Sequence, residues 1–436
     1  MSGPKKPSDR LSTGAGRRLT KAGAAGAGLL GRTALGEIRK LGAAPERREE
    51  IDAATHEANA LRIFDALGQL RGAFLKVGQL LSQQSHSLPE AYVRRLSELQ
   101  RSAPPMHGTL ARIQVKNELG RPPEEIFAEF EREPFAAASL GQVHRARLAT
   151  GEEVAVKIQY PGIERSLESD FKLLRGMLAT SRLAGRLPEM GAALDEVERH
   201  LLDEVDYVRE AEALEELRGL LADDERFVLP RVFPERSSRR VLTMELLAGR
   251  HLSDLLREDP PQEERDRLAT ALLGLFFRQT LELGVLHADP HPGNFLFLPD
   301  GRIGLLDFGC VKRFTPEFLA AHRRLLLIPV EGEEALVASY LEIGLLDPAA
   351  ENAAGQRALL LALQRLDAAK YHREGLFDFG DPEFLRSLTA LLREQLAAGL
   401  SHPQFILYMR TKLGLYNLFH QLGARVDCLR VLDPWR

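Results

Sequence analysis

Residues 285–294 read VLHADPHPGN, and residues 305–309 read LLDFG. These two stretches place a histidine, aspartates and an asparagine in a turn rich in proline and glycine and beside short apolar runs. Carboxylates so close to apolar strands are costly to bury unless a cation or a proton donor meets them. We therefore expect a divalent metal that carries a nucleotide, and the rest of the chain must supply the other parts of that site.

The spacing of these residues is that of a kinase catalytic loop. Asp289 and Asn294 are five residues apart, as are the catalytic base and the metal-ligand asparagine of kinases. Asp307 would be the main metal ligand, and carboxylate and amide oxygens suit Mg²⁺, with Mn²⁺ as an alternative. His287 and His291 raise zinc as a further alternative, but no other His or Cys has ligand spacing. We expect His287 to brace the loop through hydrogen bonds instead.

A lysine and an acidic helix would complete such a site. The run VAVK places Lys157 at the end of an apolar strand, where a kinase lysine contacts nucleotide phosphates and pairs with a glutamate. An isolated VxVK more often carries a lysine that reaches water. The segment DEVDYVREAEA offers Glu204, Asp206 and Glu210, and Glu204 and Glu210 should have different partners because they cannot share one edge of the helix. The candidates follow in kinase order: Lys157, Glu210, Asp289, Asn294 and Asp307.

The order of the predicted elements indicates an α+β, bilobal, protein-kinase-like fold with a small β-rich N-lobe, a helical C-lobe and an N-terminal helical extension. Helices are predicted over 51–84, 111–131, 163–187 and 191–220, and most of the chain after residue 251 is helical. Within 111–131, Pro122-Pro123 should open a new segment. Hairpins are predicted from QVHRARL to VAVKIQ and across Asp300-Gly301, and strands at FVLPRVF and RVLTMEL. The predicted domains are a basic Gly/Ala-rich arm (1–50), the helical extension (51–132), the N-lobe (133–247) and the C-lobe (248–436).

Composition and charge narrow the function classes. The 436 residues are 44% hydrophobic and 28% charged, as in a globular protein. Cys310 and Cys428 lie far apart, which excludes a disulfide framework and favours a reducing compartment. Up to Lys40, nine Lys and Arg face two acids, a balance of +7, whereas the whole chain carries −4 and the remainder −11. This asymmetry argues against nucleic acid as the partner of the folded part.

The basic arm has three readings: contact with an anionic membrane surface, a solubilising tail, or a transit peptide. No stretch of 18 consecutive apolar residues exists, and the tail after His402 is too charged to span a bilayer. We therefore expect a cytoplasmic protein without a transmembrane helix, with any membrane contact peripheral.

Several motifs together resemble the UbiB-like (AarF-domain) atypical protein-kinase-like family. They are KVGQ (76–79), AAAS (136–139), GQVHRA, VAVK, the EVD of 204–206, HADPHPGN and DFG, and they cover roughly 61–312. The resemblance implies that the protein binds ATP or ADP with Mg²⁺. It also implies a role in ubiquinone or related isoprenoid-lipid metabolism, with an isoprenoid or quinone-precursor lipid as partner.

The resemblance also assigns the KVGQ and EVD motifs a regulatory role. In the family, the helix that carries Lys76 and Gln79 folds over the site where a peptide substrate would lie. Lys76 would pair with the EVD motif (Glu204 and Asp206), at Glu204 in the first place, which leaves Glu210 as the partner of Lys157. Without the other motifs, Lys76 and Gln79 would read as an ordinary surface pair on one helix face.

The phosphate-covering loop is rich in alanine, as the family pattern implies. Ala136, Ala137, Ala138 and Ser139 would cover the nucleotide, and only Gly141 remains as a glycine. Glycine lets a backbone approach phosphate closely and take positive φ, and the alanines restrict both. The family is associated with an altered preference between ADP and ATP and with weak protein-kinase activity. We expect Met244 and Glu245, at the end of a strand, to form the hinge that meets adenine.

The segment after Asp307 departs from that of protein kinases. Thr315-Pro316-Glu317 already reads as a helix start, so little room is left for an activation segment, and no APE motif follows. His291 stands where protein kinases carry a lysine after the catalytic Asp. We infer that the acceptor is not a protein but a small lipid-like molecule or water. Two alternatives remain: a nucleotide-gated lipid-binding or chaperone module with little turnover, and a small-molecule phosphotransferase of the antibiotic-kinase type.

Overall fold

The computed structural model of the chain describes residues 108–138, 140–164, 167, 171–172, 198, 205–329, 332–350, 352–398, 400 and 403–436. The chain divides into two compact units. The first contains Met1–Gln114, Glu133–Val143 and Ile158–Val205, and the second contains Val115–Arg132, His144–Lys157 and Asp206–Arg436. The predicted N-terminal arm, the helix over 51–84 and most of the helix over 163–187 lie outside the described residues.

A five-stranded sheet has the order β1-β3-β4-β6, and β2 pairs with β3. Its strands are β1 (Glu129–Phe130), β2 (Ala136–Ala138), β3 (Gly141–Arg147), β4 (Glu153–Gln159) and β6 (Val241–Glu245). The predicted hairpin of β3 and β4 is confirmed, and its turn contains Gly151 at φ 93°, a conformation that glycine adopts without cost. Six consecutive residues of β4 are buried, so this strand is covered on both faces. Lys157, the third residue from its C-terminal end, is one of these buried residues.

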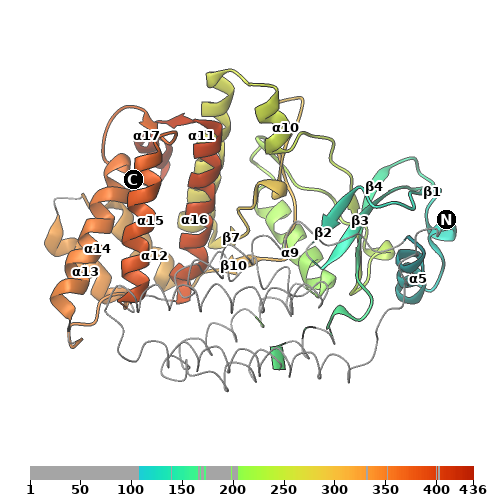
Figure 1. The fold of residues 1–436 in the computed structure, drawn as a ribbon, viewed down its shortest axis with the longest axis horizontal. Helices are drawn as coiled ribbons and strands as arrows, with labels where there is room; N and C mark the ends of the chain where they lie inside the picture. Colours follow the sequence, from blue (N-terminus) through green and yellow to red (C-terminus); the bar gives the residue numbers. More distant parts are fainter. Residues whose placement is uncertain are drawn as a thin grey trace, which may run out of the picture. The chain divides into compact units, whose positions relative to one another are not determined.

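The helical part of the second unit surrounds a central helix, α11 (Gln262–Arg278). Nearly every residue from Leu268 to Phe277 is buried, and α11 packs against α16 and α17 (Figure 1). Among the described residues from Asp206 onward, the other α-helices with more than four residues are α9 (Tyr207–Leu220), α10 (Leu252–Arg257), α12 (Pro316–Leu327), α13 (Glu333–Glu342), α14 (Ala353–Ala368), α15 (Pro382–Ala397), α16 (Pro403–Leu422) and α17 (Cys428–Leu432). Together with the sheet, they confirm the predicted α+β, kinase-like fold.

Short strands hold the two motif stretches. β8 (Phe295–Phe297) and β9 (Ile303–Leu305) form the predicted antiparallel hairpin across Gly301, and β5 (Phe227–Val228) runs parallel to β9. β7 (Val285–His287) pairs with β10 (Val311–Arg313), so the LLDFG stretch leaves one strand pair and enters the next. The turn that contains Asp307 is therefore fixed at both ends.

Two predicted helices are interrupted. In the stretch over 111–131, the predicted start of a new segment at Pro122-Pro123 is confirmed: α5 (Gly108–Leu119) ends before Gly120, which has φ 76°, and α6 (Pro123–Ile126) begins there. The helical prediction is wrong only at its end, where β1 follows α6. The helix over 191–220 is confirmed in its C-terminal part, which is α9, but it is wrong in its continuity, because the helix does not run through Asp206. Asp206 is extended, with φ −113° and ψ 94°, and its side chain caps the separate helix α9 by accepting a hydrogen bond from the Val208 backbone.

For the strands, one prediction was confirmed and several short strands were not predicted. The strand of FVLPRVF is short, as predicted, because β5 ends two residues before Pro230. β7, β10, β11 (Phe377–Asp378) and β12 (Arg425–Val426) were not predicted, since strands of two or three residues show no alternation. Among the described helices, none is both long enough and apolar enough to cross a membrane.

Candidate nucleotide site

Lys157, near the end of β4, is the centre of a buried ion cluster. Its ammonium group donates to both carboxylate oxygens of Glu210, at 2.7 and 3.0 Å, and to Oδ2 of Asp307 at 3.3 Å. The Lys157 side chain is 7% exposed. Burial alone would lower the pKa of Lys157, but the Asp307 and Glu210 carboxylates outweigh it and raise that pKa well above its usual value. Two carboxylates face one ammonium group, so the cluster has an excess of negative charge.

Glu210 joins the lysine to the LLDFG stretch. It lies in the first turn of α9, where the Asp206 cap fixes the start of the helix. Its Oε1 also accepts a hydrogen bond from the backbone N–H of Phe308 at 3.3 Å. Burial raises the pKa of Glu210, and the nearby Asp307 charge adds to this, while Lys157 opposes both. The sequence order thus corresponds to contact in space, because Lys157, Glu210 and Asp307 meet.

The backbone of Asp307 is in the left-handed region, at φ 55°, which is uncommon for a residue other than glycine. His287 Nε2 donates to the carbonyls of Leu306, at 3.1 Å, and of Asp307, at 2.8 Å. Its ring also packs edge-on against Phe308. The surrounding contacts therefore stabilise a strained turn that directs a carboxylate, 24% exposed, toward Lys157.

The catalytic-loop candidates form a second, connected group. Asn294 Nδ2 donates to Oδ2 of Asp289 at 2.9 Å and to the Asp289 carbonyl at 3.2 Å. The backbone N–H of Leu306 donates to the Asn294 carbonyl at 2.8 Å, which joins this loop to the strand end that precedes Asp307. The five-residue spacing therefore brings Asp289 and Asn294 side by side.

Sequence reasoning missed a residue on α16. Arg410 donates to Oδ1 of Asp289 at 3.2 Å, with side chains 20% and 14% exposed. The two residues are 121 positions apart and Arg410 belongs to no motif, so no local pattern could have found the pair. Gly414, one turn further along α16, packs on the same loop, and a Cβ there would overlap Pro290. Helix α16 therefore supports the loop directly.

The remaining candidates have separate places. Met244 and Glu245 end β6 as predicted; Met244 is buried and Glu245 is exposed. Asp206 caps α9 and pairs with Arg239 at 3.3 Å, so its carboxylate is not part of the Lys157 cluster. Lys76, Gln79, Ser139 and Glu204 lie outside the described residues.

The alanine-rich stretch belongs to the first unit. Ala136, Ala137 and Ala138 form β2, which pairs in antiparallel register with Gly141, Gln142 and Val143. Gly141 cannot be replaced freely, because a Cβ there would overlap the carbonyl of Ile158 in the neighbouring strand. The glycine that remains in this loop is thus required by strand packing.

The donor set fits a hard divalent cation that shares its coordination with a ligand. In the described part of the chain, no three His, Cys, Asp or Glu side chains converge as a metal cage. Asp307 and Asn294 supply carboxylate and amide oxygens from neighbouring segments, beside a cluster with excess negative charge. Mg²⁺ is held in this way in many proteins, by one or two side chains together with phosphate oxygens and water.

Comparison with known proteins gives the family. The ABC1 atypical kinase-like domain matches residues 98–341, more than half of the chain. The chain belongs to the ABC1 atypical kinase-like family. This is the family that the KVGQ, AAAS and HADPHPGN motifs indicated.

Individual relatives of this ABC1-family chain agree. The Danio rerio protein "Atypical kinase COQ8B, mitochondrial" is 33% identical to this chain. The match covers 97% of this chain and 68% of the Danio rerio protein. An aarF domain-containing protein kinase of Arabidopsis thaliana, named chloroplastic, is 35% identical over 70% of the chain, which spans only 43% of that protein. A Mycobacterium tuberculosis protein solved as a complex with erythromycin superimposes with a TM-score of 0.61 and 28% identity, over 88% of this chain and 97% of the other.

Proposed function

We propose that the protein is an atypical kinase or ATPase that binds ATP or ADP together with Mg²⁺. The observation that carries this proposal is the position of the Lys157 ammonium between the carboxylates of Glu210 and Asp307. A lysine so held offers a fixed positive charge to nucleotide phosphates, while the excess negative charge beside it attracts a divalent cation. Relatives named atypical kinases support the same class of activity.

Each residue then has a defined role. Lys157 would bind the phosphates and Glu210 would hold it in place. Asp307 and Asn294 would hold the metal ion, which neutralises the phosphate charge when it is bound. Asp289 would orient the acceptor hydroxyl or water, and the end of β6 at Met244 and Glu245 would meet the adenine.

We also propose that the acceptor is a small lipid-like molecule or water, in ubiquinone or related isoprenoid-lipid metabolism. The short connection from Asp307 through β10 to α12, whose cap is Thr315, leaves little chain for a peptide-binding activation segment. Relatives with COQ8 names support the pathway. The basic N-terminal arm would contact an anionic membrane surface where such lipids reside.

The first experiment is a thermal shift of the full chain with ATP or ADP, with and without Mg²⁺. We expect a Mg²⁺-dependent increase in the melting temperature, which Asp307→Asn abolishes. No nucleotide-dependent shift in the wild-type protein would refute the proposal. Phosphate release with and without anionic liposomes and an isoprenoid phenol then tests the lipid function, and stimulation by both is expected.

A specific observation favours a second candidate, a nucleotide-gated binding or chaperone module with little turnover. Both carboxylate oxygens of Asp289 already have partners, Asn294 on one side and Arg410 on the other. If cells tolerate Asp289→Asn but not Lys157→Met, nucleotide binding and not phosphoryl transfer is the function. Because a relative was solved with erythromycin, a macrolide belongs in the acceptor screen that would identify a drug phosphotransferase.

A further inference from the structure

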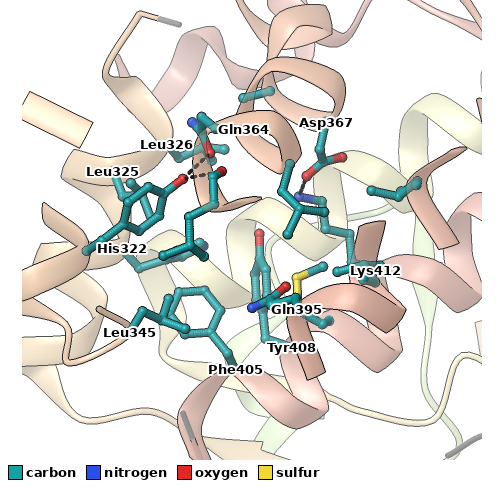
Figure 2. Close-up of a pocket in the computed structure, with 17 residues that line it drawn as sticks. His322, Leu325, Leu326, Leu345, Gln364, Asp367, Gln395, Phe405, Tyr408 and Lys412 are labelled. Carbon is teal, nitrogen blue, oxygen red and sulfur yellow. Dashed lines mark hydrogen bonds and ion pairs between the residues drawn. The ribbon is translucent and has the colours of Figure 1, made fainter. Parts of the chain in front are cut away.

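The helical part of the second unit contains a cavity that the nucleotide site does not use. It lies among α12, α14, α15 and α16, with Tyr340 of α13 at its edge, and has a volume of about 80 Å³ (Figure 2). Most of the wall is apolar, formed by leucines together with Phe405 and Met409. An engineered apolar cavity of about 150 Å³ takes up benzene, which has six carbons, so by proportion this one suits an apolar body of about three non-hydrogen atoms.

Polar atoms in the wall lack partners. His322 is 3% exposed, and among the described residues neither of its ring nitrogens has a hydrogen-bond partner. The same holds for Nε2 of Gln364, whose Oε1 accepts a hydrogen bond from the Tyr340 hydroxyl at 3.2 Å. Aromatic rings fix the His322 ring on several sides, with Phe318 stacked on it and Phe405 and Tyr408 edge-on. Buried polar groups of this kind normally have a protein, water or ligand partner.

The wall presents no net charge to a ligand. Burial, with the Lys412 charge adding to it, lowers the pKa of His322 to about 3, so the ring is neutral and offers one donor and one acceptor. The charged groups on the wall, Asp367 and Lys412, face each other as an ion pair (Figure 2). Lys370, which does not line the cavity, also donates to Asp367 from behind the wall, at 2.7 Å. A cation or an anion in the cavity would therefore find no uncompensated partner on the wall.

We propose that this cavity binds a small uncharged molecule with an apolar body and a hydroxyl group, and that the hydroxyl group bonds to His322. A hydroxyl both donates and accepts, so it can bond to one nitrogen of the neutral imidazole ring whichever tautomer is present. The apolar wall would take the body of the molecule, as in most small-molecule sites. Helix α16 supplies Tyr408 and Lys412 to this cavity and Arg410 to the catalytic loop, so the bound molecule lies one helix away from Asp289.

The test compares three probes that match this volume: 2-propanol, propane and acetate. Binding to the full chain is measured by ligand-observed NMR and by the saturable increase in melting temperature. We expect 2-propanol to bind about threefold to tenfold more tightly than propane, the value of one hydrogen bond, and the carboxylate to bind more weakly than both. In His322→Phe, which keeps a ring but removes both nitrogens, the preference for the alcohol should disappear.

Leu363→Phe is the matched control, because it fills the cavity from α14 and leaves His322 in place. It should abolish binding of both neutral probes, and unchanged binding would place the probes elsewhere and overturn the proposal. If His322→Phe does not fold, His322→Leu removes the same two nitrogens and should also abolish the preference for the alcohol. The proposal fails if neither neutral probe binds the wild-type protein, if alcohol and hydrocarbon bind equally, or if the carboxylate binds most tightly.

Discussion

Two clusters of lysine and carboxylate lie in the second unit, and they have opposite charge balance. The nucleotide-site cluster consists of Lys157, Glu210 and Asp307, and the helical cluster consists of Asp367, Lys370 and Lys412. The first has two carboxylates for one ammonium group, and Asp307 is 24% exposed. The second has one carboxylate for two ammonium groups, and the Lys370 side chain is 1% exposed. Excess negative charge that water can reach suits an incoming cation.

The helical cluster is instead satisfied within the protein. Lys370 lies over the rings of Tyr371, Phe377, Phe384 and Tyr416, at 4.6 to 5.5 Å from the ring centroids. Burial alone would raise the pKa of Asp367, but Lys370 and Lys412 outweigh it and hold that pKa far below its usual value. Burial, followed by the Lys412 charge, lowers the pKa of Lys370 despite Asp367. The Asp367 carboxylate therefore stabilises this part of the helical core, and its role is structural.

The largest expected effect is on stability, from Asp367→Asn. The variant leaves two ammonium groups without a carboxylate, so we expect the free energy of unfolding at pH 7 to decrease by about 3–5 kcal/mol. The measurement is urea unfolding. Because the folded-state pKa of Asp367 is depressed, its contribution is present above the unfolded pKa of about 4 and is lost as pH falls.

Glu334→Gln is the control for that variant, since it removes one charge from an exposed position on α13. We expect it to change the free energy of unfolding by less than about 0.5 kcal/mol. If Asp367→Asn also changes the free energy of unfolding by less than about 1 kcal/mol, the Asp367 carboxylate does not stabilise the helical core, and the structural role that we assign to this cluster is wrong.

The next effect is on function, from Lys157→Met. Loss of the phosphate-binding charge should reduce phosphate release at low nucleotide concentration about 100-fold, or about 3 kcal/mol. Lys370→Met is the matched control, because it leaves Asp367 and Lys412 as a balanced pair and should retain the nucleotide-dependent thermal shift. Equal loss of nucleotide binding in both variants would contradict a site that is confined to the first cluster.

Local patterns in the sequence predicted the parts of the nucleotide site that are continuous in the chain. The five-residue spacing placed Asn294 beside Asp289, and the Asp300-Gly301 turn predicted the β8–β9 hairpin. The break at Asp206 was missed because capping and helix continuation look alike in an acidic amphipathic run. Thr315, by contrast, was recognised as a helix start because proline follows it.

Features formed by tertiary contact were not predictable in this way. Arg410 reaches Asp289 from 121 residues away, and the aromatic enclosure of Lys370 collects residues from several helices. Nothing near Lys370 in the sequence distinguishes it from a surface lysine, the more common place for this residue type. Such clusters depend on which helix faces meet, and periodicity predicts that a face exists but not its partner.

A smaller effect concerns pH and His322, which lies beside the helical cluster. The folded-state pKa of about 3 is below the unfolded value, so the neutral ring contributes stability above about pH 6.5 that is lost as pH falls toward 3. At pH 5, this loss is about 2 kcal/mol, and His322→Phe should not show it. The measurement is urea unfolding of both proteins at pH 7 and pH 5. Equal losses in the two proteins would show that His322 is not a dry, neutral group.

The smallest expected effect tests whether Arg410 restrains Asp289. Arg410 occupies one carboxylate oxygen and Asn294 occupies the other, so an acceptor must displace one of them before Asp289 can orient it. We expect Arg410→Gln to increase phosphate release about threefold to tenfold, or about 1 kcal/mol, because the ion pair is only partly buried. The nucleotide-dependent thermal shift should not change, since Arg410 pairs with Asp289, whereas Lys157 is held by Glu210 and Asp307.

Arg410→Lys is the control for this test. It keeps the charge but offers a single donor group in place of the planar guanidinium, so its rate should lie between those of the wild-type protein and Arg410→Gln. A decrease of tenfold in Arg410→Gln would reverse the interpretation: the arginine would then position Asp289 for reaction. In that case Lys157 would bind the nucleotide phosphates, the excess negative charge beside it would attract the metal ion, and the positive charge of Arg410 from α16 would belong to the reactive geometry itself.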